Sequence, residues 1–540
     1  MTGDYRMRKI ICIILTVLII GSLTSCKGDD SENQVIYYNL EKSPTTLDPQ
    51  ISDTYYSQMV VKNLFEGLTL TDENDKVLPG VAKSWDISKD GLEYVFHLRE
   101  NASWSDEDAT EVTADDFVYG IQRTLDPAMG STMAENLYMI KNARSYNKGS
   151  CSESDLGIEA VSKRTLRIRL EYPDADFLRV LSTVPTMPCN RKFFDSTQGQ
   201  YGLTYDTIMG NGPFELKGKH SWSYGSYIKL SKSESYKGSR KPIAKGLTFW
   251  LRKDVSDAIK SISDGEVDAA PLSIDQLDEA RENNFNITSF ADQTWGLCFN
   301  LSDKLMKNSD IRIGLIKGID RGYALSELPS DSAQTRNIVP DLLKIKGVSY
   351  RKSTQDDFLL TQSSNAGAYI ENGLKSLNLK SLPTVTIICL NDSKTKSIIN
   401  NCIEKWNKNL GYYFNIEPLS NSELMERVSS REYQIALAPV ISKSENPIDF
   451  LSMFKSGSED NIFELNSSEY DLILNTINNK DVTNQIKSCL KAERFLHQNA
   501  VFYPMYTGNT YFASAPNVTG VVFYPYNGGV DFISAKKVKK

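Results

Sequence analysis

The sequence predicts an α/β protein, because strand-like and helix-like segments alternate in three separate parts of the chain. The first part is Pro79–Arg123, the second starts with a strand at residues 247–252, and the third with a strand at 383–390. In each part, a β-type apolar pattern is joined to a segment with helical character. Alternation of this kind is typical of sheets covered by helices.

Pro79–Arg123 is predicted to form a strand, a corner and a helix. An Asp-Gly turn at residues 90–91 precedes a run in which apolar side chains alternate from Leu92 to Leu98, as in a half-buried strand. Thr113 has the character of a helix N-cap, and the two aspartates after it suit the helix dipole. Apolar residues at helical spacing then predict the buried face of that helix: Phe117, Ile121 and Leu125.

The second and third parts predict further α/β structure. Residues 247–252, 256–262 and 265–269 have the patterns of a strand, a helix and a strand. In the third part, the β-branched strand 383–390 is followed by apolar residues at helical spacing, with Asp392 or Ser393 as the cap. A strand over 412–416 completes a β-α-β unit.

Length and charge limit the number of domains and the classes of partner. A chain of 540 residues exceeds what one hydrophobic core usually organises, so two or three domains are expected. The formal net charge is −7 and the chain has no concentrated basic patch, so no nucleic-acid partner is expected.

The N-terminus has the pattern of a bacterial targeting segment. Three basic residues precede the apolar run Ile10–Ile20, which is shorter than the roughly 20 residues a spanning helix needs. The following Leu23-Thr24-Ser25-Cys26 resembles a bacterial lipobox. The resemblance implies a signal peptide over residues 1–25, cleavage before Cys26, diacylation of the Cys26 sulfur and tethering to a membrane surface.

Six further cysteines leave two alternatives open. They are Cys151, Cys189, Cys298, Cys389, Cys402 and Cys489, and none belongs to a C-x-x-C pair. In an oxidising compartment they have 15 possible pairings, and the alternative is buried free thiols. Without C-x-x-C pairs, zinc and thioredoxin-like chemistry have no support, and no metal or other cofactor is expected.

Pro79–Arg123 also resembles the signature segment of extracytoplasmic solute-binding proteins of family 5, which serve peptide and nickel ABC transporters. The resembling residues are Pro79-Gly80, Ala82, Trp85, Asp90-Gly91, Tyr94–Leu98, Arg99, Trp104-Ser105-Asp106, Thr113-Ala114 and Asp116-Phe117. Weaker resemblances continue along the chain, as at Asn63–Leu68 and Asn211–Leu216. One departure is Glu107, where the family usually has glycine.

The resemblance implies a two-lobed fold of the periplasmic-binding-protein type II, in its large three-domain peptide-binding subtype, with a hinge between the lobes. Domain I is then discontinuous and domain II is inserted in it. The implied boundaries are 30–66, 205–297 and 503–540 for domain I, 67–204 for domain II and 298–502 for domain III.

The implied function is that of a substrate-binding lipoprotein of an ABC importer. It captures extended oligopeptides between two lobes and delivers them to the permease subunits, as a monomer on the outer side of the cytoplasmic membrane. Main-chain hydrogen bonds hold an extended peptide as an added strand would. Two alternatives are a cell-wall-derived peptide and a non-peptide solute as the ligand, and a third is a surface adhesion or signalling role.

Three candidate ligand contacts lie in the near lobe or beside the crossover. Asp53 and Tyr55 occupy the positions at which the family offers an acidic residue and backbone groups to the ligand. Trp295 lies where the family places an aromatic wall. The alternative for Tyr55 and Trp295 is packing in the core or the hinge.

The far-lobe candidates are Lys443, Glu445 and Asn446, in a loop before Pro447. Peptide binders of this family have an aspartate where Lys443 stands, and it holds the ammonium of the peptide. A cation there repels an ammonium, so three alternatives arise. Glu445 takes over the ammonium, Lys443 meets a carboxylate, or Lys443 points into solvent.

Catalysis is not expected. The three histidines, His97, His220 and His497, lie in separate segments, and no nucleophile elbow, zinc-protease motif or phosphate loop occurs. Adjacent acids such as Asp115 and Asp116 are explained by helix capping.

Overall fold

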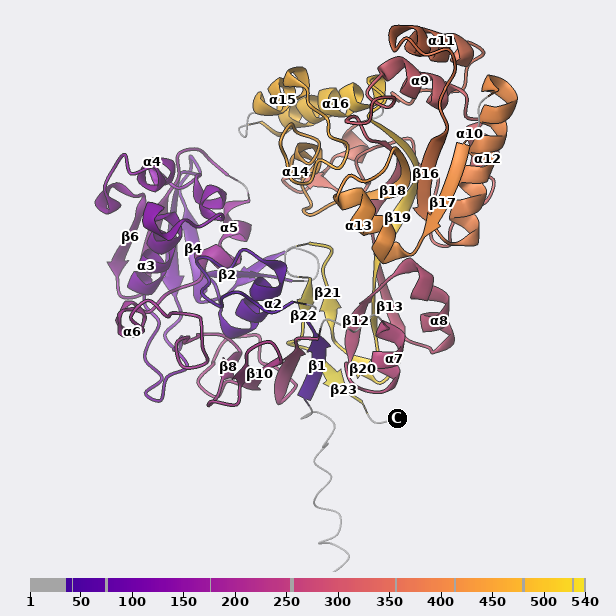
Figure 1. Cartoon of the computed structure of the whole chain (residues 1–540). Helices are drawn as coiled ribbons and strands as arrows, with labels where there is room; N and C mark the ends of the chain where they lie inside the picture. The colour runs from indigo at the N-terminus through magenta and orange to yellow at the C-terminus, as the bar shows by residue number, and fades with distance from the viewer. Residues whose placement is uncertain are drawn as a thin grey trace, which may run out of the picture.

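The computed structural model describes residues 35–538, apart from 41, 73–75, 175, 253–256, 355–356, 412–413, 478–480 and 527–528. Figure 1 shows two lobes. The near lobe, mostly indigo to magenta, lies beside the far lobe, mostly orange and yellow. Strands β13 (Asn286–Phe299) and β19 (Phe502–Ser514) run between them. The predicted two-lobed α/β class is confirmed.

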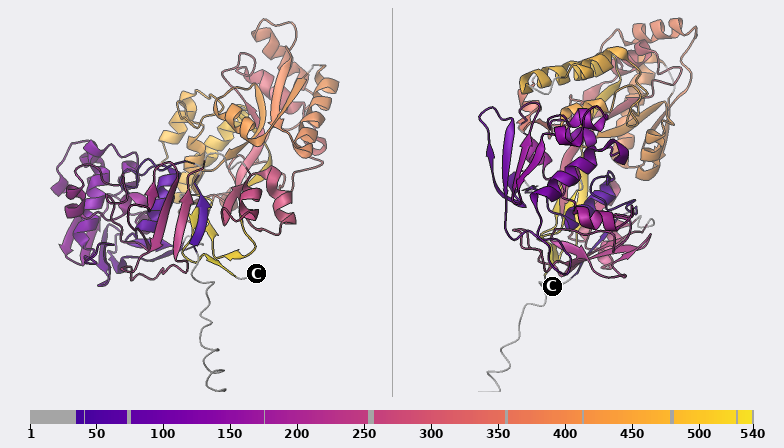
Figure 2. Two further views of the ribbon diagram at one scale, coloured as in Figure 1. Left: turned by 60° about the horizontal axis from the view of Figure 1, so that its bottom comes forward. Right: turned by 90° about the vertical axis from the view of Figure 1, so that its left-hand side faces the viewer.

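Within the described ranges, one mixed sheet of eleven strands runs through both lobes. Its order is β17-β16-β18-β13-β19-β12-β1-β11-β10-β8, with β9 paired to β10. Besides β13 and β19, the strands are β1 (Val35–Asn39), β8 (Phe214–Leu216), β9 (Trp222–Ser223), β10 (Tyr227–Lys232), β11 (Gly246–Trp250), β12 (Ala269–Leu272), β16 (Val385–Leu390), β17 (Phe414–Leu419) and β18 (Ile435–Ile441). Figure 2 shows from a second side how the near-lobe strands line up next to the crossover.

A second sheet in the near lobe has the order β4-β5-β7-β6 (Ala82–Ile87, Glu93–Leu98, Thr165–Arg169 and Ile158–Ser162). Helix α3 (Ala114–Leu125) begins as predicted, because the backbone N–H and Oγ1 of Thr113 both donate to Asp116 Oδ2, at 2.7 and 3.0 Å. Its predicted apolar face is fully buried at Phe117, Ile121 and Leu125. The predicted strand, turn and helix of this segment are confirmed.

The far lobe contains the predicted β-α-β unit. Strands β16 and β17 pair in parallel, and α12 (Ser393–Leu410) connects them. Asp392 caps this helix, since its Oδ1 accepts from the backbone N–H groups of Lys394 and Thr395 at 2.9 Å each. Residues 412–413 of the predicted second strand lie outside the described residues.

The other helices and short hairpins complete the two lobes. The helices are α2 (Tyr55–Leu64), α4 (Ala143–Asn147), α5 (Phe177–Val180), α6 (Arg191–Ser196), α7 (Ala258–Ser263), α8 (Leu277–Glu282), α9 (Ser309–Lys317), α10 (Arg321–Ala324), α11 (Ala366–Ser376), α13 (Asn421–Ser429), α14 (Pro447–Ser452), α15 (Ser468–Asn475) and α16 (Val482–Gln498). The hairpins pair β2 with β3 (Thr69–Thr71, Val77–Pro79), β14 with β15 (Lys344–Ile345, Val348–Ser349), β20 with β23 (Val518–Thr519, Lys536–Lys537) and β21 with β22 (Val522–Phe523, Val530–Asp531).

The buried apolar residues form one core in each lobe and a small third cluster. The far-lobe core extends from Trp295 to Tyr506, and the near-lobe core combines residues 36–251 with Ala269 and residues 512–535. The small cluster lies around α7 and α8. The near-lobe core draws on both predicted domains I and II, and the predicted domain boundaries stay a prediction.

Strands β13 and β19 change from one core to the other over a few residues. Phe290 and Phe512 pack in the near lobe, whereas Trp295 and Tyr506 pack in the far lobe. The β13–β19 pairing is irregular in this stretch, between Phe290 and Gln293 and again between Trp295 and Gly296. We therefore place the hinge at residues 290–295 and 506–512.

Asp292 occupies the first irregularity and is almost completely buried. Its carboxylate accepts from the backbone N–H of Thr510 at 3.0 Å and from the Thr510 hydroxyl at 2.8 Å. Burial raises the pKa of Asp292 to about 6. The Asp292 carbonyl accepts from the N–H of Ser442 at 3.0 Å, so the hinge is hydrogen-bonded to the start of the 442–446 loop.

A buried ion pair fixes the segment before α2 to the end of α3. Arg123 Nη2 lies 2.7 Å from Asp48 Oδ2, and both side chains are at most 5% exposed. Arg123 Nη1 also donates to Asp48 Oδ1 at 3.1 Å, and the guanidinium lies 3.9 Å from the centre of the Phe194 ring. A buried charge of this kind depends on its partner, because its hydration has been lost.

Some sequence predictions fall outside the described residues, namely the signal peptide over 1–25 and the lipidated Cys26. Helices in the described part of the chain are all too short or too polar to cross a membrane. The six described cysteines are free thiols, which decides between the two alternatives left open by the sequence.

Asp48→Asn should lower the free energy of unfolding of the near lobe by about 3–5 kcal/mol at pH 7, because it leaves the Arg123 charge buried without its counter-ion. Denaturant unfolding followed by circular dichroism measures the loss. The matched control is Arg252→Gln, which breaks the half-exposed Arg252–Glu266 pair and should cost less than about 1 kcal/mol. Equal losses of unfolding free energy in the two variants would contradict the stabilising role of the Asp48–Arg123 ion pair.

Candidate functional site: a charged cavity between the lobes

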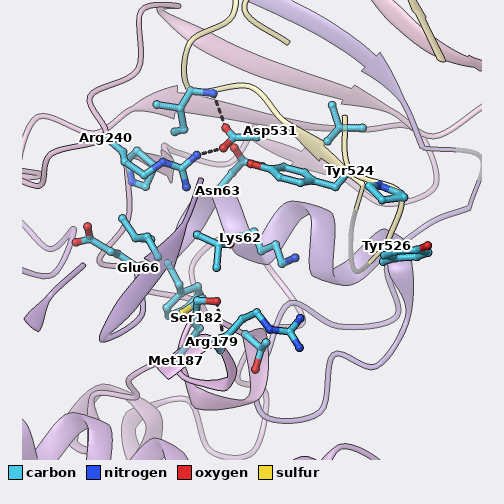
Figure 3. A pocket seen from close by; sticks show the side chains of 18 of the residues that line it. Lys62, Asn63, Glu66, Arg179, Ser182, Met187, Arg240, Tyr524, Tyr526 and Asp531 are labelled. Carbon is cyan, nitrogen blue, oxygen red and sulfur yellow. Dashed lines mark hydrogen bonds and ion pairs between the residues drawn. The ribbon is translucent and has the colours of Figure 1, made fainter. Parts of the chain in front are cut away.

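A cavity of about 140 Å³ lies where the near lobe meets the loop before α14 of the far lobe. Its near-lobe wall comes from α2, β2, α5 with the residues after it, and the β21–β22 hairpin with its turn. Glu445 is the far-lobe residue in its lining. Figure 3 shows the side chains that line this cavity. The charged ones are Lys62, Glu66, Arg179, Arg240, Glu445 and Asp531.

An ion pair joins the two lobes across this cavity. Arg179 Nη1 on α5 lies 2.6 Å from Glu445 Oε1, and the two side chains are 30% and 19% exposed. Glu445 is held from the far-lobe side as well, because its carbonyl accepts from the N–H of Lys344 at 2.7 Å. The short helix α5 presents Arg179 because Phe177 is buried in the near-lobe core, which leaves residue 179 at the surface.

Further charges surround this ion pair. Lys346 Nζ of the far lobe lies 3.9 Å from Asp174 Oδ1 of the near lobe. Burial raises the pKa of Asp449 on α14, and the positive charge of Arg179 partly offsets that effect. The pKa of Asp176 is raised by burial too, with the charge of Arg179 again acting in the opposite direction. The lobes therefore meet through charges of both signs.

The near-lobe wall carries two more cations. Arg240 forms an ion pair with Asp531 of β22, and the backbone N–H of Ile533 donates to the same carboxylate at 2.8 Å. Lys62 extends from α2, and its ammonium points into the cavity (Figure 3). Burial lowers the pKa of Lys62 to about 8, and the charge of Arg240 contributes to the shift.

Glu66 lies deeper, where the chain leaves α2. It forms an ion pair with Arg99 and accepts from the Tyr236 hydroxyl at 3.0 Å. Burial raises the pKa of Glu66, and Arg99 counteracts that effect. Asn211 accepts from the N–H of Glu66 at 3.0 Å and donates to its carbonyl at 2.9 Å, which fixes the backbone here. Glu66 and Arg99 belong to the segments that resemble the family.

Asp53 and Tyr55 lie at the start of α2, outside the residues that line the cavity. Asp53 is exposed and accepts from the Thr132 hydroxyl at 3.0 Å. Tyr55 is 40% exposed and packs edge to face on Tyr56, with the turn at Gly529 against its hydroxyl. Whether either residue contacts a ligand stays a prediction.

Trp295 is 4% exposed and stacks on Tyr506, with ring centres 5.7 Å apart. Its Nε1 donates to Gln293 Oε1 at 3.0 Å. Both rings belong to the far-lobe core beside the hinge, which corresponds to the alternative of hinge packing. A ligand contact of Trp295 stays a prediction.

The three predicted residues of the 442–446 loop have different surroundings. Lys443 is exposed and forms an ion pair with Asp460 within the far lobe. Glu445 lines the cavity. Asn446 is the N-cap of α14, and its Oδ1 accepts from the N–H of Ile448 at 2.9 Å. Proline at the first position of α14 suits that helix start.

Sequence reasoning missed the near-lobe residues of the cavity. Lys62, Arg179 and Arg240 stand in three distant segments, and the tyrosines at 524 and 526 in a fourth. No local motif marks them. The one available signal was the aromatic segment 523–526, in which Tyr524 and Tyr526 line the cavity.

The arrangement suits reversible binding of a polar ligand that carries charge. It offers a guanidinium, an ammonium, a carboxylate, hydroxyls and aromatic rings on walls that belong to two lobes. Within the described ranges, no three or more His, Cys, Asp or Glu side chains gather where a metal ion could be held. The expectations of no cofactor and no catalysis stay predictions.

Comparison with known proteins gives the class. Residues 76–461 match the model of the bacterial extracellular solute-binding proteins, family 5 Middle. The chain therefore belongs to the bacterial extracellular solute-binding proteins of family 5, as its signature segment predicts. This is a class of extracellular solute-binding proteins and not a class of enzymes.

Individual relatives cover almost the whole chain. The dipeptide-binding protein DppE of Bacillus subtilis is 28% identical over 515 residues, which are 95% of this chain and 93% of that protein. The oligopeptide-binding protein OppA of Bacillus subtilis is 26% identical over 529 residues, 95% of each chain. The substrate-binding domain of an oligopeptide ABC transporter from Bacillus anthracis has a TM-score of 0.69 at 25% identity, covering 94% of this chain and 99% of that one. The predicted type II two-lobed fold is confirmed.

Arg179→Glu should move the lobes apart in the ligand-free protein, because it replaces the interlobe attraction to Glu445 by repulsion. Loss of a partly exposed ion pair costs about 0.5–1 kcal/mol, so the ratio of open to closed forms should rise roughly two- to fivefold. The rise should be larger for Arg179→Glu, because this substitution also reverses the sign of the charge. Spin or dye labels on the two lobes report the distance distribution. The double variant Arg179→Glu with Glu445→Arg should restore the wild-type distance distribution. A wider distance distribution in the double variant would contradict the role of this ion pair.

Proposed function

We propose that this protein is the lipid-anchored, oligopeptide-binding component of an ABC importer. It captures an extended peptide between its lobes and presents it to the permease subunits. Support comes from the family, from relatives named for dipeptide and oligopeptide binding, and from the two-lobed fold with a hinge. It acts as a monomer on the outer side of the cytoplasmic membrane.

The observation that carries the proposal is the position of Glu445. Its carboxylate lies in the interlobe cavity, whereas the cation two residues earlier, Lys443, is turned outward to Asp460. The repulsion that Lys443 would exert on a peptide ammonium is therefore removed. Among the three alternatives for this loop, the geometry favours Glu445 as the residue that receives the ammonium.

The binding reaction exchanges one ion pair for another. In the free protein, Glu445 is satisfied by Arg179 of the opposite lobe. A peptide ammonium that replaces Arg179 keeps the Glu445 carboxylate paired. No unpaired carboxylate then remains in the low-dielectric cavity. Because α14 and Asp292 fix the two ends of the 442–446 loop, the carboxylate is held ready for the ligand.

The membrane anchor rests on the sequence before the described residues. The lipobox-like Leu23-Thr24-Ser25-Cys26 supplies the modification site, and residues 27–34 then link the lipid to β1. A linker of this length keeps both lobes within reach of a membrane-embedded permease.

Cell-wall-derived peptides and non-peptide solutes remain as outcomes of the ligand test.

Gently purified protein should carry peptides that mass spectrometry identifies, and calorimetry should show binding of a free-amine peptide. Glu445→Gln should weaken that binding about tenfold or more, because a charge-assisted hydrogen bond to the ammonium is lost. An N-acetylated peptide should be insensitive to the substitution. Glu464→Gln, which alters a far-lobe acid paired with Arg431, is the matched control. Retention of a non-peptide solute, with no peptide response, would refute the proposal.

Cys26→Ser should release the protein from the membrane. In a lipoprotein-processing bacterium, the wild type should partition into the membrane fraction and gain labelled fatty acid, whereas the variant should do neither. Cys12→Ser, within the segment expected to be removed, serves as control. If the Cys26 variant stays in the membrane fraction and the wild type gains no labelled fatty acid, no lipid is attached at this position.

A further inference from the structure

One buried carboxylate joins the two ends of a far-lobe segment, residues 338–351. Glu493 on α16 has a side chain that is only 2% exposed. Its Oε1 accepts from the backbone N–H groups of Ile338 and Val339 at 2.9 and 3.0 Å, and its Oε2 accepts from the Tyr350 hydroxyl at 2.9 Å. Arg351 forms an ion pair with the same carboxylate. We call these five residues the Glu493 cluster.

The cluster uses the whole hydrogen-bonding capacity of the Glu493 carboxylate. An ionised carboxylate has about four acceptor positions, and two N–H groups, a hydroxyl and a guanidinium occupy them here. Burial acts to raise the pKa of Glu493, but Arg351 and the other partners outweigh burial, so the pKa lies below its usual value. Nε and Nη2 of Arg351 also donate to the Val339 carbonyl at 3.1 and 3.0 Å. The charged carboxylate therefore holds the two ends of the segment together.

Between these two ends, the segment forms the β14–β15 hairpin. Leu343 and Ile345 are buried in the far-lobe core, and β14 packs against α16. The two turn residues, Lys346 and Gly347, have φ angles of 49° and 76°, and a type I′ turn requires positive φ at both positions. A two-residue turn leaves the hairpin little internal freedom. A shift at the ends of the segment should therefore displace the hairpin as a unit.

The hairpin contacts the interlobe site at two points. The backbone N–H of Lys344 donates to the Glu445 carbonyl at 2.7 Å. At the turn, Lys346 Nζ lies 3.9 Å from Asp174 Oδ1 of the near lobe. The 442–446 loop is bonded to the hinge at one end and caps α14 at the other, and the hairpin holds residue 445 between them.

We propose that Glu493 is a positioning residue for peptide binding: the Glu493 cluster fixes the β14–β15 hairpin, and the hairpin directs Glu445 at the ligand. Glu493 acts through Glu445 and does not touch the peptide. A carboxylate that is held in place binds an ammonium more tightly than a mobile one, because less freedom is lost on binding. This inference rests on the proposed function, since it takes Glu445 as the residue that receives the peptide ammonium.

The amine preference of the protein measures how well Glu445 is placed. It is the ratio of the affinities, from calorimetry, for a neutral tetrapeptide with a free N-terminus and for the same peptide after N-acetylation. In the wild type, this ratio should be about tenfold or more. Glu493→Gln keeps the shape of the side chain but leaves Arg351 without its counter-ion. The amine preference should then fall at least about threefold, while the affinity for the acetylated peptide stays within about twofold.

A substitution in the hairpin tests the same connection without a change in the core. Lys344→Pro removes the N–H group that bonds the Glu445 carbonyl, so it should lower the amine preference as well. The matched control is Lys380→Pro, the same exchange at an exposed residue of the loop between α11 and β16, which should leave the preference unchanged. If Glu493→Gln does not fold, Tyr350→Phe replaces it, because it removes a single hydrogen bond of the Glu493 cluster.

Ile370→Ala separates positioning from stability. Ile370 is fully buried on α11 and lies against Gly314 of α9, outside both the Glu493 cluster and the hairpin. Truncation of a buried side chain and loss of one partner of a buried ion pair cost similar amounts of stability. Ile370→Ala should therefore lower the unfolding temperature about as much as Glu493→Gln does. Its amine preference should nevertheless equal that of the wild type.

An unchanged amine preference in folded Glu493→Gln or Lys344→Pro, or an equal fall in Ile370→Ala, would overturn the positioning role and leave the proposed function intact. A wild type that binds the free-amine and acetylated peptides equally would also overturn it, because Glu445 would then not receive the ammonium. If the wild type binds neither peptide, the proposed function fails, and the positioning role fails with it.

Discussion

The antiparallel pairing of β13 with β19 is the constraint on which the rest of the molecule depends. It places two strands, far apart in sequence, as the shared centre of a sheet that continues into both lobes. The far lobe attaches through β18, and the near lobe through β12. The two crossover strands lie side by side, and their pairing is irregular where they pass from one core to the other.

Outside the two apolar cores, charged side chains form contacts between the lobes. Arg179 with Glu445 and Lys346 with Asp174 form ion pairs between the lobes, and Tyr526 of the near lobe packs against the far-lobe core, so the contact between the lobes is partly polar. Arg179 and Glu445 also line the cavity. The hydrogen bond from the Ser442 N–H to the Asp292 carbonyl connects the 442–446 loop to the hinge.

The local fold followed from the sequence wherever a short-range pattern determines it. The capped helix at Thr113, the strand to Leu98 and the β-α-β unit were predictable because alternation, caps and turns act over a few residues. Glu445 was found as a candidate through a family motif. Lys62, Arg179 and Arg240 were not, because the cavity brings together segments that lie 117 and 61 residues apart in the sequence. The outward direction of Lys443 depends on Asp460, a partner that no spacing rule selects.

The state of the cysteines has a consequence for how the chain matures. Burial raises the pKa of Cys189, Cys389, Cys402 and Cys489 to about 12 and that of Cys298 as well. Since only the thiolate attacks disulfides or oxidants, roughly one in 10⁵ of a thiol with pKa near 12 is reactive at pH 7. Once the protein is folded, these five buried thiols are therefore protected from oxidation at pH 7, whereas the partly exposed Cys151 is the described thiol open to oxidation. Burial in the folded cores is what protects these thiols.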